Sequence, residues 1–265
     1  MNEKKTHTQP ISVAIITKNE EERLPDCIKS VAFAEEILVV DSGSGDRTRE
    51  VARSLDARVL NEPWRGFSGQ KQFAVDQCRH DWVLILDADE RIPKDTVKAI
   101  TEALTFRNPD IAAAFGFRRK NYLRGRWIRH CGWWPDRIVR LVDRRRGRFD
   151  GRPVHERWIT EGEVKSLDAI IEHISFRNFS ELVKKMEDYS DLAARDLYDK
   201  KGRISPLKPV SHGLWMFMKT YFIERGFLEG FDGFVISVMN AGGSFLKYAK
   251  LIELIEGEEK SGAAV

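Results

Sequence analysis

Cysteine and long apolar runs are scarce in this sequence, and each scarcity excludes a class of protein. The three cysteines, Cys27, Cys78 and Cys131, are too few and too scattered for a disulfide framework or a thiolate zinc site. No segment reaches the ~18 consecutive apolar residues of a membrane span, and the opening MNEKKTHTQP lacks the apolar core of a secretory signal. We therefore expect a cytoplasmic protein in a reducing compartment.

Two glycine-rich nucleotide-binding motifs are also missing. Residues 42–46 (SGSGD) lack the third glycine of the dinucleotide fingerprint G-x-G-x-x-G, and no G-x-x-x-x-G-K-[ST] loop occurs. These absences argue against an NAD-dependent enzyme and against a P-loop ATPase.

The net charge of +3 conceals a local excess of positive charge. Between Arg118 and Arg152 the chain has thirteen basic residues and three acidic ones, which indicates an anionic partner. The small overall charge and the lack of a recognised nucleic-acid module argue against RNA or DNA. We keep a nucleic-acid-binding protein and a non-catalytic membrane-surface protein as distant alternatives.

Apolar segments alternate with helix-favouring segments in the first third of the chain. Strands are predicted at residues 11–17, 36–41, 57–60 and 82–87, and helices at 20–31, 47–55, with Asp46 as N-cap, and 69–78. This alternation predicts an α/β fold with parallel strands, in which ligands bind outside the carboxyl ends of the strands.

The second half of the chain follows a different pattern. A helix is predicted at residues 93–106, and extended segments at 112–119, 137–142, 153–158 and 167–174 indicate a mixed sheet. From Phe179 the chain is predicted to be helical, and residues 214–254 are rich in aromatics. Residues 214–254 would contact a membrane or a second copy of the chain, or would simply pack against the protein's own core. We expect a catalytic region at 1–178, with halves 11–110 and 111–178, and a helical region at 179–265.

The segment LDADE, residues 86–90, is the strongest local signal for chemistry. Asp87 and Asp89 follow a buried strand, and such closely spaced carboxylates repel each other unless a cation lies between them. Their hard oxygens suit Mg²⁺ or Mn²⁺, which would bridge a diphosphate. The alternative is an acidic turn that caps the next helix.

Four motifs in order resemble a known family. SVAIITKNEEERL, EILVVDSGSGDRT, GFSGQKQFAVD and WVLILDADE resemble the nucleotide-sugar-binding half of family 2 glycosyltransferases. The resemblance is closest to the lipopolysaccharide inner-core β-1,4-glucosyltransferases and extends from about Ser12 to Arg177. It implies a GT-A fold, a Rossmann-like mixed sheet that binds a nucleotide sugar, followed here by a helical C-terminal extension.

The resemblance also implies roles for residues at the strand ends. Asp89, Asp87 and His173 would be metal ligands, with Asp89 the more direct one. The residues that would bind the UDP-sugar are Thr17, Asn19, Glu20, Asp41, Ser42, Lys71, Asp87, Ala88 and Asp89. The alternative for His173 is a structural role, which is common for a single histidine on a strand.

The base that would deprotonate the acceptor departs from the family pattern. The family has a Glu-Asp pair at the place that reads GRPVHERW in this chain. Here His155 stands in place of the glutamate and Glu156 in place of the aspartate. Glu156 takes the base role in this interpretation, and His155 stays an alternative. The alternative to a catalytic role for Glu156 is an ordinary ion pair on the protein surface.

Acceptor binding is predicted for the basic segment CGWWPDRIVRLVDRR. Trp133 and Trp134 would stack on sugar faces, and Arg137 would hold phosphate groups, although one of the two tryptophans is expected to belong to the core.

The function that follows is an inverting, metal-dependent hexosyltransferase. It would use a UDP-sugar, UDP-glucose in this interpretation, with Mn²⁺ or Mg²⁺, and add the sugar to a heptose of a lipid-linked lipopolysaccharide inner core. The alternative is another cell-envelope glycan or a protein as acceptor. The enzyme would lie in the cytoplasm or peripherally on the inner face of the cytoplasmic membrane, with the oligomeric state open.

Overall fold

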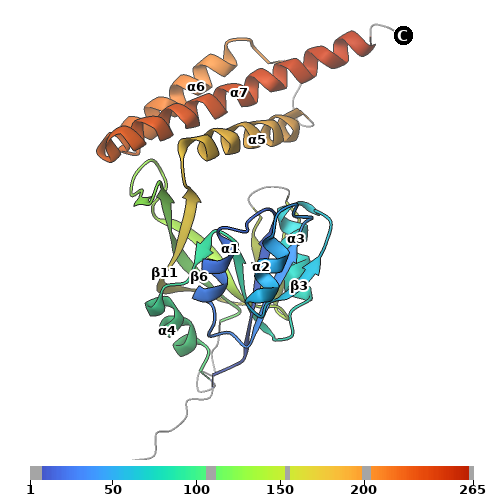
Figure 1. Cartoon of the computed structure of the whole chain (residues 1–265). Helices are drawn as coiled ribbons and strands as arrows, with labels where there is room; N and C mark the ends of the chain where they lie inside the picture. Colours follow the sequence, from blue (N-terminus) through green and yellow to red (C-terminus); the bar gives the residue numbers. More distant parts are fainter. Residues whose placement is uncertain (1–7, 106–111, 153–155, 199–203, 263–265) are drawn as a thin grey trace, which may run out of the picture. The chain divides into compact units, whose positions relative to one another are not determined.

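A computed structural model describes residues 8–105, 112–152, 156–198 and 204–262. The chain divides into two compact units (Figure 1). The sheet unit comprises Met1–Lys120 and Asp136–His173, and the helical unit comprises Asn121–Pro135 and Ile174–Val265.

The first half of the sheet unit is parallel, as the alternation predicted. Its strands lie in the order β3 (Arg58–Asn61), β2 (Glu36–Asp41), β1 (Ile11–Thr17) and β4 (Trp82–Asp87). All seven residues of β1 are buried, because β1 pairs with β2 on one side and β4 on the other and both of its faces are covered.

Helices cover both faces of these strands. Ile11, Val13 and Ile15 of β1 share a core with α1 (Leu24–Ser30), α2 (Thr48–Ser54) and α4 (Lys94–Ala103). The alternate residues Ala14 and Ile16 pack with α3 (Gly66–Asp76) on the opposite face. This two-sided burial explains why the strands read as continuous apolar runs.

Two expectations about helix starts need correction. Helix α1 begins at Leu24 rather than near Glu20, because the backbone N–H of Glu20 is donated to Thr48 Oγ1 in a loop. The N-cap position of α2 is Arg47. Asp46 still acts nearby, since its carboxylate accepts the N–H of Thr48 at 3.0 Å.

The remaining strands make the sheet mixed, as expected. After β4 the order continues with β8 (Asp136–Asp143), β6 (Ala114–Leu123), β11 (Val164–Phe176) and β5 (Glu90–Arg91), and β7 (Arg126–Trp127) pairs with β6. The strand expected at 153–158 is wrong for Glu156 and Arg157, which are not in a strand, while 153–155 lie outside the described residues. Trp158 begins β10 (Trp158–Thr160), which pairs with β9 (Gly147–Phe149).

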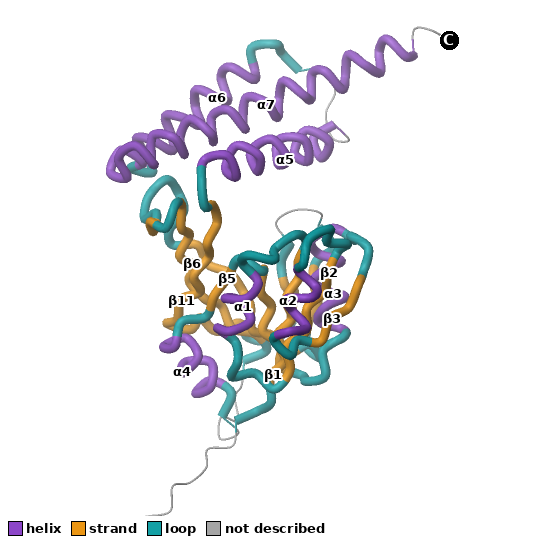
Figure 2. Tube along the Cα trace, in the orientation of Figure 1, coloured by secondary structure: helices purple, strands orange, loops and turns teal. Residues whose placement is uncertain are grey.

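The helical unit contains the C-terminal helices. They are α5 (Phe179–Tyr198), α6 (Lys208–Met218), a π-helical turn η1 (Lys219–Ile223), a 3₁₀ turn η2 (Gly226–Glu229) and α7 (Gly230–Gly262). Helix α7 packs against both α5 and α6 (Figure 2). Gly242 and Gly243 allow α5 to approach, because a Cβ on either would meet Met186 at 3.2 or 3.1 Å. Among the described residues, no helix is both long enough and apolar enough to cross a bilayer.

Candidate active site

The carboxyl ends of three parallel strands meet at one edge of the sheet. The register pairs Thr17 of β1 with Asp41 of β2, and Ile16 of β1 with Asp87 of β4. Residues 24 and 71 positions apart in the sequence are therefore neighbours at this edge, where an open α/β sheet binds its ligands.

Hydrogen bonds join the loops that follow β1 and β2. Asn19 has a positive φ of 56°. Its N–H is donated to Ser44 Oγ at 2.8 Å, and its Oδ1 accepts the N–H of Gly45 at 2.8 Å. The N–H of Ser42 reaches the carbonyl of Thr17 at 2.9 Å. Asn19 and Ser42 therefore hold the two loops together at the sheet edge.

Asp41 and Thr17 differ in how fully they are bonded. Asp41 is completely buried, and its carboxylate accepts the N–H groups of Gly43 and Ser44 and the hydroxyl of Ser44. Thr17 is also buried, yet its Oγ1 has no hydrogen-bond partner among the described residues. Asp41 shapes the turn, whereas Thr17 holds an unsatisfied hydroxyl at the edge, which is a feature that calls for a ligand or water.

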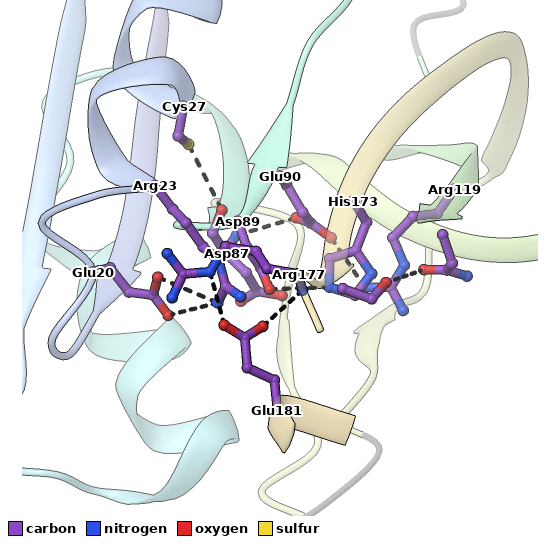
Figure 3. Close-up of polar contacts among 12 residues, drawn as sticks. Glu20, Arg23, Cys27, Asp87, Asp89, Glu90, Arg119, His173, Arg177 and Glu181 are labelled. Carbon is purple, nitrogen blue, oxygen red and sulfur yellow. Dashed lines mark hydrogen bonds and ion pairs between the residues drawn. The ribbon is translucent and has the colours of Figure 1, made fainter. Parts of the chain in front are cut away.

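The turn after β4 brings Asp89 to His173. Residues 88 and 89 connect β4 to the short strand β5, and β5 pairs with β11 so that Glu90 lies opposite His173. This pairing places His173 Nε2 3.2 Å from Asp89 Oδ2 (Figure 3). Ala88, between the two aspartates, is buried. The structure thus brings together Asp89 and His173, which are 84 positions apart in the chain.

Asp87 lies in a buried network of charges. Its carboxylate is 3.1 Å from Lys71 Nζ on α3 and 2.6 Å from Arg140 Nη2 on β8. Arg140 also contacts Glu90 Oε1 at 2.7 Å, and Arg119 contacts the same oxygen at 3.0 Å. Lys71, Arg140 and Glu90 are all less than 10% exposed.

The cations keep Asp87 ionised. Burial alone would raise the pKa of Asp87, but Arg140, Lys71 and Arg119 outweigh it and hold that pKa well below its usual value. Arg140 in turn has a raised pKa, because Asp87 and Glu90 outweigh its own burial. The thiol of Cys27, 3.6 Å from the carbonyl of Asp87, has its pKa raised by burial and by Glu90 and is not a thiolate ligand.

Lys71 also connects Asp87 to Glu156. Its Nζ lies 2.6 Å from Glu156 Oε1, so one buried ammonium group contacts both the D-x-D turn and the predicted base. Glu156 is partly exposed, with 17% of its side chain accessible. His155, the alternative base, lies outside the described residues.

Sequence reasoning missed the roles of Arg140, Glu90 and Arg119. The excess of positive charge between Arg118 and Arg152 is smaller than the sequence indicates, because several of its arginines form ion pairs within the protein, among them Arg118 with Asp168, Arg119 with Asp136 and Arg145 with Asp143. A signal for Arg140 was available, because it is a single charge within the apolar run IVRLV. Such a charge on a buried strand must be paired.

The predicted acceptor residues have ordinary surroundings. Trp133 and Trp134 are both half-buried in the helical unit, where Trp133 packs against Phe176 and Trp134 meets Trp127 edge-on at 5.2 Å. Arg137 belongs to the sheet unit and is exposed. Their roles in acceptor binding stay predictions.

The donor set at the D-x-D turn suits a divalent cation shared with a substrate. No group of three His, Cys, Asp or Glu side chains within the described residues is arranged to hold a metal alone. Asp89 and His173 supply an adjacent oxygen and nitrogen, while Asp87 is committed to Arg140 and Lys71. Mg²⁺ and Mn²⁺ sites commonly use one or two protein ligands and complete the shell with phosphate oxygens and water.

Comparison with known proteins gives a consistent assignment. The family model of glycosyl transferase family 2 matches residues 12–159, more than half of the chain. An uncharacterised glycosyltransferase of Rickettsia typhi is 34% identical over 254 residues, covering 92% of this chain and 87% of the relative. A lipopolysaccharide core biosynthesis glycosyltransferase of Rhizobium meliloti is 33% identical over 256 residues, covering 92% of each chain.

One solved structure resembles the chain only weakly. Glucosyl-3-phosphoglycerate synthase of Mycobacterium tuberculosis, in complex with Mg²⁺ and UDP, gives a TM-score of 0.38 at 21% identity and covers 52% of this chain and 57% of that one. A likeness at this level says nothing about individual site residues.

Proposed function

The chain belongs to glycosyl transferase family 2 and has its GT-A fold, and from this we propose that it is an inverting, metal-dependent hexosyltransferase. It transfers a hexose, glucose in this proposal, from a UDP-sugar to a heptose of a lipid-linked lipopolysaccharide inner core. Residues 1–178 carry the catalysis, and the enzyme works at the inner face of the cytoplasmic membrane.

One observation supports the proposal above all. Asp89 and His173 lie 3.2 Å apart at the carboxyl-end edge of the sheet, next to a D-x-D aspartate that two buried cations hold ionised. This combination offers an oxygen and a nitrogen ligand to Mn²⁺ or Mg²⁺ beside a turn whose conformation is fixed by ion pairs. The unpaired hydroxyl of Thr17 at the same edge supports a nucleotide site there.

The two aspartates have separate tasks in this proposal. Asp89 and His173 would hold the cation, which when bound would supply positive charge against the negative charge that develops on the UDP leaving group. The carboxylate of Asp87 is already in contact with Arg140 and Lys71, so its task in this proposal is not to bind the cation. Its contacts with Arg140 and Lys71 fix the conformation of the turn that presents Asp89.

Glu156 accepts the proton of the acceptor hydroxyl. Its contact with Lys71 Nζ at 2.6 Å keeps the carboxylate oriented toward the D-x-D turn. The hydroxyl oxygen then attacks the anomeric carbon in line with the leaving UDP, so that the configuration inverts. His155 is the second candidate for this role.

A relative of known pathway supports the choice of acceptor class. The Rhizobium protein that shares 33% identity over nearly the whole chain is named for lipopolysaccharide core biosynthesis. A lipid-linked acceptor with phosphorylated sugars also suits exposed cations such as Arg137. Another cell-envelope glycan of the same chemistry is the alternative acceptor.

Two matched variants test the site. We expect Asp89→Asn to abolish the extra thermal stabilisation that Mn²⁺ adds to UDP, and Glu156→Gln to retain that stabilisation while transfer falls about 10²–10⁴-fold. Asp188→Asn and Glu253→Gln make the same chemical changes at exposed positions of the helical unit and should behave as wild type. Wild-type transfer by Glu156→Gln would exclude Glu156 as the base. A manganese response that survives Asp89→Asn would exclude the metal site.

A further inference from the structure

The helical unit exposes an unusual number of large apolar side chains. Nineteen such side chains are exposed among the described residues, and twelve of them lie between Leu207 and Phe245. The most exposed are Leu207 (75%), Phe231 (68%), Leu214 (64%) and Ile223 (63%). Single exposed apolar residues are common, but a concentration of this kind marks an interaction surface.

We call the twelve exposed apolar side chains between Leu207 and Phe245 the apolar face. Leu207, Val210, Leu214 and Met218 follow helical spacing along α6. A groove of about 500 Å³ between α6 and α7 is lined entirely by apolar side chains and glycine, including Val210 and Leu214 from α6 and Phe245 from α7. Because one groove borders exposed residues of both helices, the two helices present them to the same side.

An aromatic cluster extends the apolar face around the turn between the helices. The ring of Tyr221 in η1 lies 5.1 Å from Phe222, 6.3 Å from Phe227 and 6.0 Å from Phe234, measured between centroids. Phe222, Phe227 and Phe234 are each 44–51% exposed. The turn between α6 and α7 is therefore aromatic on its outside.

The acidic side chains of this region are neutralised within the helical unit. Residues 207–245 contain three of them. Glu224 pairs with Lys219 at 3.3 Å, Asp232 pairs with Arg124 at 3.3 Å, and Glu229 is buried against Arg126 at 2.5 Å. Glu229 also accepts hydrogen bonds from the backbone of Arg129 and from His130. None of these carboxylates adds an uncompensated negative charge to the apolar face.

Cations remain at the border of the apolar face. Arg225 lies between η1 and η2 with φ of 56°, is exposed, and forms no ion pair within the described ranges. Lys208 lies over the ring of Tyr248 at 5.5 Å and Lys247 over the same ring at 4.6 Å. Exposed aromatic and aliphatic side chains bordered by Lys and Arg are typical of a helix pair that lies in the interface of an anionic membrane.

We propose that the apolar face inserts into the surface of an anionic phospholipid leaflet, with acyl chains covering the groove between α6 and α7. The charge pattern favours an anionic lipid surface over a second copy of the chain, because the carboxylates of an identical face are already paired and offer the bordering cations no partner. The inference deepens the proposed function, because the same contact brings the enzyme to a lipid-linked acceptor. The membrane contact itself does not depend on the identity of the acceptor.

Vesicle flotation of the full chain tests the proposal. We expect the wild type to float with vesicles of phosphatidylglycerol and phosphatidylcholine, and to float much less with phosphatidylcholine alone or in high salt. Replacing Ile223 and Phe231 together by Ser should lower partitioning by about a hundredfold, since each large side chain removed from the lipid contributes roughly a factor of ten. Arg225→Gln should reduce binding severalfold to anionic vesicles only.

A matched control uses the same chemistry elsewhere in the helical unit. Val183 and Leu192 on α5 are 43% and 44% exposed, and replacing both by Ser should leave flotation unchanged. Failure of the wild type to float with anionic vesicles would overturn the proposal. So would a dimer in sedimentation that Ile223→Ser with Phe231→Ser dissociates while vesicle binding is absent.

Transfer to a soluble, deacylated acceptor separates this inference from the proposed function. The Ile223→Ser, Phe231→Ser variant should keep wild-type transfer to that acceptor and wild-type stabilisation by UDP with Mn²⁺. If the wild type floats but transfers no sugar to any core acceptor, the membrane surface stands and the proposed function fails. If the wild type transfers sugar to a core acceptor but does not float, the proposed function stands and the membrane surface fails.

Discussion

The two units distribute polar and apolar groups in opposite ways. The sheet unit buries charge: Asp87, Glu90, Arg140 and Lys71 lie together at the carboxyl-end edge, the last three less than 10% exposed. The helical unit exposes apolar side chains along α6, η1, η2 and α7. The exposed apolar side chains of the helical unit point to a partner that covers them. The charges of the sheet unit are paired with one another, so what points to a ligand there is the adjacent pair of metal donors, Asp89 and His173.

A second buried carboxylate shows that burial of charge by itself is not a site. Glu36 lies at the amino end of β2 and is 5% exposed. Burial alone would raise the pKa of Glu36, but hydrogen bonds from Ser12, the Arg79 backbone and Arg58 outweigh it and lower that pKa. Glu36 is therefore satisfied by its own neighbours. At the other edge, two buried cations gather beside Asp87, and Asp89 and His173 form an adjacent pair of metal donors.

The largest expected effect on stability comes from removing Arg140. Arg140→Met removes the cation that the half-buried Asp87 and the fully buried Glu90 share, and we expect the free energy of unfolding in urea to fall by about 3–5 kcal/mol. Lys98→Met is the control, because its ion pair with Glu102 joins side chains that are 77% and 66% exposed and should contribute only about 0–1 kcal/mol. Equal losses in the two variants would show that burial does not distinguish the two ion pairs.

A pair of isoleucines in the helical unit sharpens the comparison from the apolar side. Ile236 on α7 is fully buried and Ile223 in η1 is 63% exposed. Ile236→Ala should cost about 2–5 kcal/mol of unfolding free energy, whereas Ile223→Ala should change it by less than about 0.5 kcal/mol. Thermal or urea unfolding measures both. A large loss from Ile223→Ala would mean that this side chain packs inside the unit and does not belong to the apolar face.

The smallest effect is the dependence of stability on pH. Because the pKa of Asp87 is lower in the folded than in the unfolded chain, its contribution to stability is present above about pH 4, the unfolded value, and is lost as the pH falls through the lowered folded pKa. Urea unfolding between neutral and acid pH should show this loss. Asp87→Asn should flatten the acid part of the curve relative to wild type, and an unchanged slope would contradict the assigned ionisation.

Sequence patterns predicted much of the sheet unit but little of its charge network. The bounds of β1, β2 and β4 follow from apolar runs buried on both faces, and the positions of Asp41 and Asp87 at strand ends follow from those runs. The contact between Lys71 and Glu156 joins residues 85 positions apart, and no local pattern encodes it. Arg140 was visible as a charge inside an apolar run, yet its partners depended on how β8 pairs with β4.

Local side-chain chemistry, read along the chain, was enough to determine the parallel half of the sheet, the D-x-D turn and the helical character of the C-terminal region. Only the tertiary structure decided that Asp87 is held by Arg140 and Lys71, that β5 pairs with β11 to bring His173 to Asp89, and which apolar residues of α6 and α7 are exposed. The physical reason is range. Strand and helix periodicity act between neighbours in the sequence, whereas ion pairs and the burial of a helix face depend on segments that meet only after folding.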